Sequence, residues 1–271
     1  MDLTQDSYPY INGMGLRNRC DMIFDEYQRD NLDKIKYDGQ FIFVKTDLIP
    51  MFFNSVVPKL NRSVIIITHN SALGIDIKYK KYLDDPRIMR WYAQNANFNH
   101  PKLHSLPVGI AHRYWPHGDI FEIDRVKKAE IKKDHLVYMN FDLKTNIQER
   151  TKVYDMFINE DYVLEGKRKP FGEYLEDLAR SKYALSPPGA GIDCHRIWES
   201  IAVGTVPIVQ DCHNISFHTN MPILIIENWE EITKEYLEER YDTFKSKNYT
   251  TDPLYLDYWY EKIGMPVLPR E

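Results

Sequence analysis

Short runs of apolar residues recur along the chain, separated by longer polar stretches with helical spacing. In the first half, residues 41–44 and 64–67 are apolar throughout, and residues 103–110 lead into a glycine turn. In the second half, residues 136–139, 183–185, 206–209 and 222–226 form similar runs. Continuous apolar runs without alternation are typical of parallel strands covered on both faces. The pattern therefore predicts an α/β protein.

The chain is long enough for two such α/β units. Its 271 residues would make two compact halves of ordinary domain size. Residues 118–134 are charged and weakly periodic, and a new strand pattern begins at 136–139. We therefore expect an N-terminal domain over residues 1–133 and a C-terminal domain over residues 134–271.

Composition excludes several classes of protein. A net charge of −5 gives no electrostatic footprint for nucleic acid. Three widely spaced cysteines make neither a disulfide framework nor a zinc site. No apolar run approaches the roughly 18–20 residues of a membrane span, and the first residues lack the pattern of a secretory signal. We expect a soluble, cytoplasmic protein without a metal site or a nucleic-acid partner.

Residues 186–199 carry the most chemical information; they read Ser-Pro-Pro-Gly-Ala-Gly-Ile-Asp-Cys-His-Arg-Ile-Trp-Glu. They lie between two predicted strands, so the order is strand, glycine turn, helix, strand. The N-terminus of such a helix favours a negative charge, and Arg196 in its first turn could reach the same anion. Glu199 follows on the same face. This order suits a nucleoside diphosphate, with phosphate at the turn and ribose at Glu199. Turn glycines beside a solvated Arg–Glu pair are the structural alternative.

Around this segment the chain resembles the exostosin-like glycosyltransferases. Their pattern is a Ser-Lys-Phe strand, Pro-x-Gly, a small-residue loop, an Arg, an acid one turn later and Gly-x-x-Pro-Val-Ile. Here residues 181–189 read Ser-Lys-Tyr-Ala-Leu-Ser-Pro-Pro-Gly, followed by Arg196, Glu199, Gly204 and Pro-Ile-Val at 207–209. The variant Asp-Cys-His-Arg at 193–196 is similar to exostosin-like proteins of large algal viruses. The resemblance is dense only over residues 165–212.

The resemblance implies a GT-B enzyme, with two Rossmann-like domains facing a central cleft and a C-terminal helix returning to the first domain. It implies inverting, metal-independent transfer from a nucleotide sugar to a glycan or glycoprotein, without a cofactor. A UDP-sugar is favoured, and UDP-xylose fits the viral variant. The chain contains no Asp-x-Asp, the metal motif of GT-A enzymes. The implied donor-binding residues are Pro188, Gly189, Ala190, Gly191, His195, Arg196 and Glu199, with Arg150 as a second phosphate contact.

Polar residues that follow the strands of the first half are candidates for the acceptor side. Ligands of open α/β sheets lie at the carboxyl ends of the strands. Inverting transfer needs a base there, and we rank Asp76 first, then His69 and Asp47. Further residues expected at the cleft are Asn70, His112, Arg113 and Trp115. Capping by the acids and a hydrated surface loop around 112–117 are the structural alternatives.

Other readings remain open at the level of sequence. A GDP-fucose-using transferase has a comparable arginine in its donor domain. An inactive relative would bind a sugar or a nucleotide without turnover. A phosphotransferase is disfavoured because the chain lacks a Walker lysine. If the chain is viral, it would act in the cytoplasm of the host.

Overall fold

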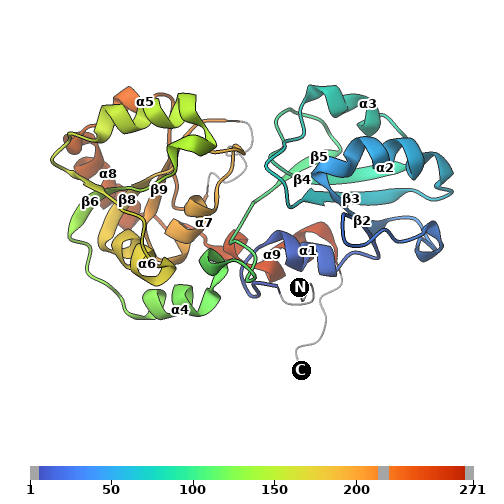
Figure 1. Cartoon of the computed structure of the whole chain (residues 1–271), viewed down its shortest axis with the longest axis horizontal. Helices are drawn as coiled ribbons and strands as arrows, with labels where there is room; N and C mark the ends of the chain where they lie inside the picture. The colour runs from blue at the N-terminus through green and yellow to red at the C-terminus, as the bar shows by residue number, and fades with distance from the viewer. Residues whose placement is uncertain (1–5, 213–219, 266–271) are drawn as a thin grey trace.

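The computed structural model describes residues 6–212 and 220–265, which form two α/β lobes (Figure 1). The first lobe contains a five-stranded parallel sheet in the order β1-β2-β3-β4-β5. Its strands are β1 (Met22–Phe24), β2 (Gln40–Lys45), β3 (Val64–His69), β4 (Ile88–Gln94) and β5 (Leu103–Leu106). The α/β class expected from the apolar runs is confirmed.

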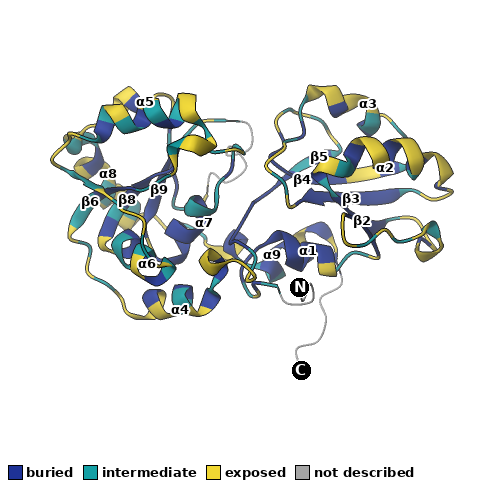
Figure 2. Cartoon of the chain, viewed as in Figure 1, coloured by how far each residue is buried: buried dark blue, intermediate teal, exposed yellow. Residues whose placement is uncertain are grey.

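Helices cover both faces of this first sheet. Because spatial order follows chain order, right-handed crossovers put the connecting helices on one face. These are α2 (Ile49–Ser55) and α3 (Lys80–Leu83), whereas α1 (Gly13–Asn18) and α9 (Leu256–Ile263) lie on the other (Figure 1). The central strands β2 and β3 are therefore buried on both sides, as Figure 2 shows, which is why they read as continuous apolar runs.

The second lobe holds a parallel sheet in the order β10-β9-β8-β6-β7. The order reverses between β6 and β8, and ligands of such sheets bind at this reversal. Its strands are β6 (His135–Met139), β7 (Val163–Glu165), β8 (Ser181–Leu185), β9 (Val206–Gln210) and β10 (Leu224–Ile226). One face is covered by α5 (Ile147–Phe157) and α8 (Lys234–Ser246), and the other by α4 (Ile120–Lys128), α6 (Phe171–Arg180) and α7 (His195–Ala202).

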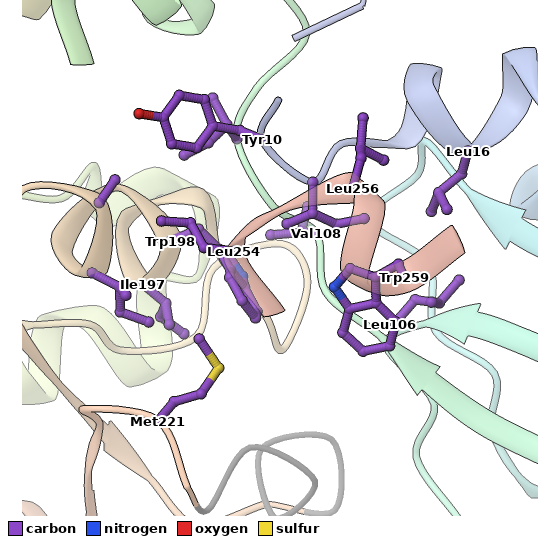
Figure 3. Packing of buried hydrophobic residues seen from close by; sticks show 14 of the residues in the cluster. Tyr10, Leu16, Leu106, Val108, Ile197, Trp198, Met221, Leu254, Leu256 and Trp259 are labelled. Carbon is purple, nitrogen blue, oxygen red and sulfur yellow. The ribbon is translucent and has the colours of Figure 1, made fainter. Parts of the chain in front are cut away.

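The C-terminal helix α9 returns to the first lobe, as expected. The Leu256 N–H donates to the Pro9 carbonyl at 2.9 Å, and the Tyr260 hydroxyl donates to the Gly15 carbonyl at 3.0 Å. Figure 3 shows that one apolar cluster runs from Leu16, beside α9, to Trp198 of the second lobe. The two lobes therefore share one continuous apolar core.

Helix α4 precedes the domain boundary expected at residue 133 but packs on α6 of the second lobe (Figure 1). Arg125 on α4 pairs with Glu176 on α6 at 2.7 Å. We therefore propose that the second domain begins at α4, and that residues 107–119 cross between the domains. The charged residues of α4 indicate a helix with one face in solvent. They do not indicate that the other face packs on α6, because charge patterning does not reveal tertiary contacts.

Candidate functional site

A cavity of about 540 Å³ lies between the two lobes. Its walls come from the strand ends of the first lobe, from the crossing segment 107–119 and from the loop after β8. The candidate residues on this wall are His69, Asn70, His112, Trp115, Arg150, Gly189, Ala190, Gly191 and His195. The end of β3, the crossing segment, α5 and the loop after β8 therefore face one space.

The loop after β8 leaves the sheet beside the reversal of strand order and leads into α7. Cys194, the N-cap residue of α7, makes no side-chain cap bond. Both loop glycines are in close contact with other elements. A Cβ on Gly189 would lie 2.7 Å from Arg150 Nη2, and one on Gly191 would lie 2.7 Å from Asn95 Nδ2. Larger residues would push the loop away from both neighbours.

Arg150 positions this loop. Its guanidinium donates to the carbonyls of Pro188 at 3.1 Å, Asp142 at 3.0 Å and Pro187 at 3.3 Å. Burial, together with the nearby Arg196 guanidinium, lowers the pKa of Arg150 from its ordinary value. Three of its donors are therefore engaged by backbone carbonyls, and direct contact with phosphate stays a prediction.

Arg196 differs from Arg150 although the two guanidinium groups approach the same ring. Their Cζ atoms lie 5.7 and 5.5 Å from the centroid of Phe141. Within the described residues, Nε and Nη1 of Arg196 are buried without a hydrogen-bond partner. Buried charged donors without partners are costly, so such a group is poised to receive anionic oxygens.

Glu199 lies in a buried polar cluster beside Arg196. The Tyr174 hydroxyl donates to its Oε2 at 2.7 Å. Burial raises the pKa of the Glu199 carboxyl, while Tyr174, Arg196 and His117 oppose that rise. Pro188, Arg196 and Glu199 do not line the large cavity; Pro188 lines a neighbouring cavity of about 240 Å³.

Asp193 and His195 join the loop to the rest of the molecule. The Val108 N–H donates to Asp193 Oδ2 at 2.7 Å, and the Asp193 N–H donates to Asn95 Oδ1 at 3.0 Å. His195 Nδ1 donates to the Gly109 carbonyl at 2.7 Å. Burial raises the pKa of Asp193 to about 7 and lowers that of His195 below its ordinary 6.5. Asp193 was visible in the motif, but spacing alone does not show that it reaches the crossing segment.

The three residues expected as bases occupy different environments. Asp76 caps a short 3-10 turn, accepts from the Lys78 N–H at 3.0 Å, pairs with its ammonium and lies outside the cavity wall. Asp47 is exposed and also lies off the wall. His69 lines the cavity, but Nε2 contacts the Pro107 carbonyl at 2.9 Å and Nδ1 accepts from the Asn70 N–H at 2.8 Å. Burial lowers the pKa of His69 to about 4.

The crossing segment places most of its candidate residues at the cavity. His112 and Trp115 line the wall, whereas the Arg113 guanidinium lies off it, 4.8 Å from the centroid of the Phe121 ring. The wall residues that sequence reasoning missed include Gln94, at the end of β4, and the aromatic residues Tyr27 and Tyr114. Gln94 ends a strand whose exposed residues at 89 and 90 break the apolar run, so no strand was predicted there.

Across the described ranges 6–212 and 220–265, no group of three His, Cys, Asp or Glu residues could hold a metal ion. Within the same ranges, every helix is too short or too polar to cross a lipid bilayer.

Comparisons with known proteins agree with the resemblance in the second half. Residues 141–265 match the family model described as "RXYLT1 C-terminal domain", of the exostosin-like glycosyltransferases. Human ribitol-5-phosphate xylosyltransferase 1 is 31% identical over 75 residues, which cover 22% of this chain and 17% of the human protein.

Solved structures similar to this chain include glycosyltransferases with low sequence identity. One is α,α-trehalose 6-phosphate synthase from Burkholderia multivorans, with a TM-score of 0.49 and 10% identity over 86% of this chain and 72% of that one. Another is apo OtsA, with a TM-score of 0.45 and 11% identity over 80% of this chain and 67% of that one. The fold is α/β with two parallel sheets, and these structural neighbours are GT-B glycosyltransferases.

Proposed function

We propose that this protein is a glycosyltransferase that moves a sugar from a nucleotide-sugar donor to a hydroxylated acceptor. The observation that carries the proposal is the Arg196 guanidinium, whose Nε and Nη1 are buried without partners. It lies near the loop at the reversal of strand order, since Arg150, which binds that loop, approaches the same Phe141 ring. Those two N–H groups supply what a diphosphate leaving group needs.

The neighbouring groups fit the rest of a nucleoside diphosphate. Tyr174 occupies Oε2 of Glu199, and the ribose hydroxyls would donate to the other carboxylate oxygen. The Gly189 N–H already donates to the Gly191 carbonyl at 3.0 Å, so the amides of residues 190 and 191 and the first turn of α7 would add donors to the phosphates. As the nucleotide leaves, negative charge develops on its terminal phosphate, and the fixed guanidinium stabilises that charge.

We propose His195 as the base that removes the acceptor proton, ahead of Asp76, His69 and Asp47. Its Nδ1–H donates to Gly109, which fixes the tautomer and leaves the lone pair on Nε2. It lines the cavity, and its lowered pKa keeps it neutral at pH 7. The exostosin-like resemblance supports an inverting, metal-independent reaction with a UDP-sugar. The human relative is named as a xylosyltransferase acting on ribitol 5-phosphate, which supports xylose as the transferred sugar. The glycan or glycoprotein acceptor rests on the exostosin-like resemblance alone.

Calorimetry with UDP-xylose, other UDP-sugars and GDP-fucose, all in EDTA, tests the proposal. We expect one UDP-sugar to bind and the Arg196→Ala variant to lose that binding. Selective binding of GDP-fucose would replace the donor assignment. Binding without turnover across an acceptor panel would indicate an inactive binding protein. Absence of binding to every nucleotide sugar, with or without acceptor, would overturn the function.

A further inference from the structure

Gln94 ends β4 and lies on the wall of the large cavity, on the side of the first lobe. The residue is 3% exposed, and among the described residues no donor reaches its Oε1. A buried amide oxygen without a donor is costly, and native proteins rarely retain one without a reason. A hydroxyl group that enters the cavity would supply the missing donor.

Three exposed aromatic residues line the same cavity. Tyr27, Tyr114 and Trp115 are 58%, 56% and 53% exposed, although large aromatic side chains are normally buried. Trp115 stacks on His117 with a centroid distance of 6.1 Å and meets Tyr114 edge-on at 5.5 Å. The crossing segment therefore presents a set of contiguous rings at the cavity.

The turn that carries Tyr114 and Trp115 is closed by hydrogen bonds within its own backbone. The Trp115 N–H donates to the His112 carbonyl at 2.9 Å, and the Gly118 N–H donates to the Trp115 carbonyl at 2.8 Å. A Cβ on Gly118 would lie 2.2 Å from the His112 carbonyl oxygen, so the turn packs too tightly for any larger residue. The backbone that carries Trp115 is therefore fixed before a ligand arrives, which reduces the entropy lost on binding.

The charged groups on this side of the cavity already have partners. Lys45 pairs with Glu26 at 2.6 Å, and Asp25 pairs with Arg17 at 2.6 Å. The wall therefore combines an amide oxygen that needs a donor, aromatic faces and neutralised charges. That combination matches a neutral polyhydroxylated ring, which has hydroxyls at its edge and C–H groups on its faces.

We propose that Gln94 and the rings of Tyr27, Tyr114 and Trp115 form the acceptor subsite for a pyranose sugar. A sugar hydroxyl donates to Gln94 Oε1, and one C–H face of the ring stacks on Trp115. The inference rests on the proposed function, and it names the acceptor class as a cyclic sugar rather than a linear sugar alcohol.

The test uses saturation-transfer NMR with methyl β-pyranosides and with ribitol, in the presence of UDP. We expect transfer to the axial protons on one face of a methyl pyranoside and little transfer to ribitol. Trp115→Ala should abolish this signal, and Trp115→Phe should restore most of it. Phe121→Ala is the matched control, since Phe121 is exposed and close in sequence but lies off the cavity wall.

Gln94→Leu separates recognition from structure. Removal of an unsatisfied acceptor should leave the melting temperature unchanged or higher, while pyranoside affinity falls about tenfold. Equal signals from ribitol and the pyranosides, a Trp115→Ala variant that binds normally, or no pyranoside binding would overturn the subsite. UDP affinity, measured by calorimetry on the same samples, reports on the donor site separately. Retained UDP binding with a failed subsite leaves the proposed function standing.

Discussion

Replacement of Arg196 by alanine should remove catalysis and leave the fold intact. The reason is the state of the guanidinium, whose Nε and Nη1 make no hydrogen bond within the described residues. Truncation therefore breaks no internal bond to these atoms. The variant loses the cation–π contact with Phe141, worth about 0.5–1 kcal/mol, and the attraction between Arg196 and Glu199, but it also relieves the repulsion between Arg196 and Arg150. The free energy of unfolding should therefore change little.

The catalytic cost follows from the same two N–H groups. If each donates to a diphosphate oxygen, each charge-assisted bond contributes about 1.5–3 kcal/mol. Their joint loss is then about 3–6 kcal/mol, or a fall in kcat/KM of about 10²–10⁴-fold. Arg196→Lys keeps the charge without the planar fork and should fall between wild type and alanine.

Arg150→Ala is the matched control because its guanidinium binds two carbonyls of the loop after β8 and the Asp142 carbonyl of the segment after β6. It should lower the free energy of unfolding by about 2–4 kcal/mol. Thermal melts and the kcat/KM for donor turnover, measured on both variants, separate a chemical role from a structural one. A folded Arg196→Ala protein with kcat/KM within about threefold of wild type would refute the reasoning.

Four further measurements probe the site and the fold. The pKa of Asp193 rises from 3.8 to about 7 on folding, so the free energy of unfolding should fall by up to about 4 kcal/mol as the pH rises through that window. In Asp193→Asn the melting temperature should vary less with pH. Glu199→Gln should weaken UDP binding about tenfold but affect 2′-deoxy-UDP less, unless the ribose lies elsewhere. For His195, whose pKa is lowered, the acid limb of kcat/KM should lie below pH 6.5, and a limb above it would count against the base. Gly109→Ala should lower the free energy of unfolding, measured by denaturant titration, by at least about 2 kcal/mol, because φ is +69° and a Cβ would lie 2.0 Å from the Ile11 carbonyl oxygen.

Strands covered on both faces were the part of the fold that could be predicted. The runs 41–44, 64–67, 183–185 and 206–209 lie within β2, β3, β8 and β9. Strands β1 and β7 have only three residues each, too few for a pattern, and the exposed positions 89 and 90 interrupt β4. Short and partly exposed strands are specified by their neighbours, which a single sequence does not reveal.

For the site, the rule that ligands bind at the carboxyl ends of parallel strands located the right regions. It did not predict which hydrogen bonds each side chain makes there. Asn70 and Gly189 lie on the cavity wall because parallel strands bring their carboxyl ends to one edge. Asp76 also follows a strand, yet its carboxylate caps its own turn, a local bond that competes with any role in the cleft. The unsatisfied oxygen of Gln94 has no signal in the sequence, since it depends on which donors the completed fold brings near.

One segment connects donor recognition to the placement of the acceptor domain. In the loop after β8, Gly189 lies against Arg150. Four residues later, Asp193 binds both the crossing segment and Asn95 of the first lobe. A donor that orders this loop therefore also orders the contacts between the lobes. Such coupling is reciprocal, so an acceptor held by the first lobe should tighten donor binding by the same factor. Asp193, which lines the cavity and binds the crossing segment, should therefore affect both affinities together.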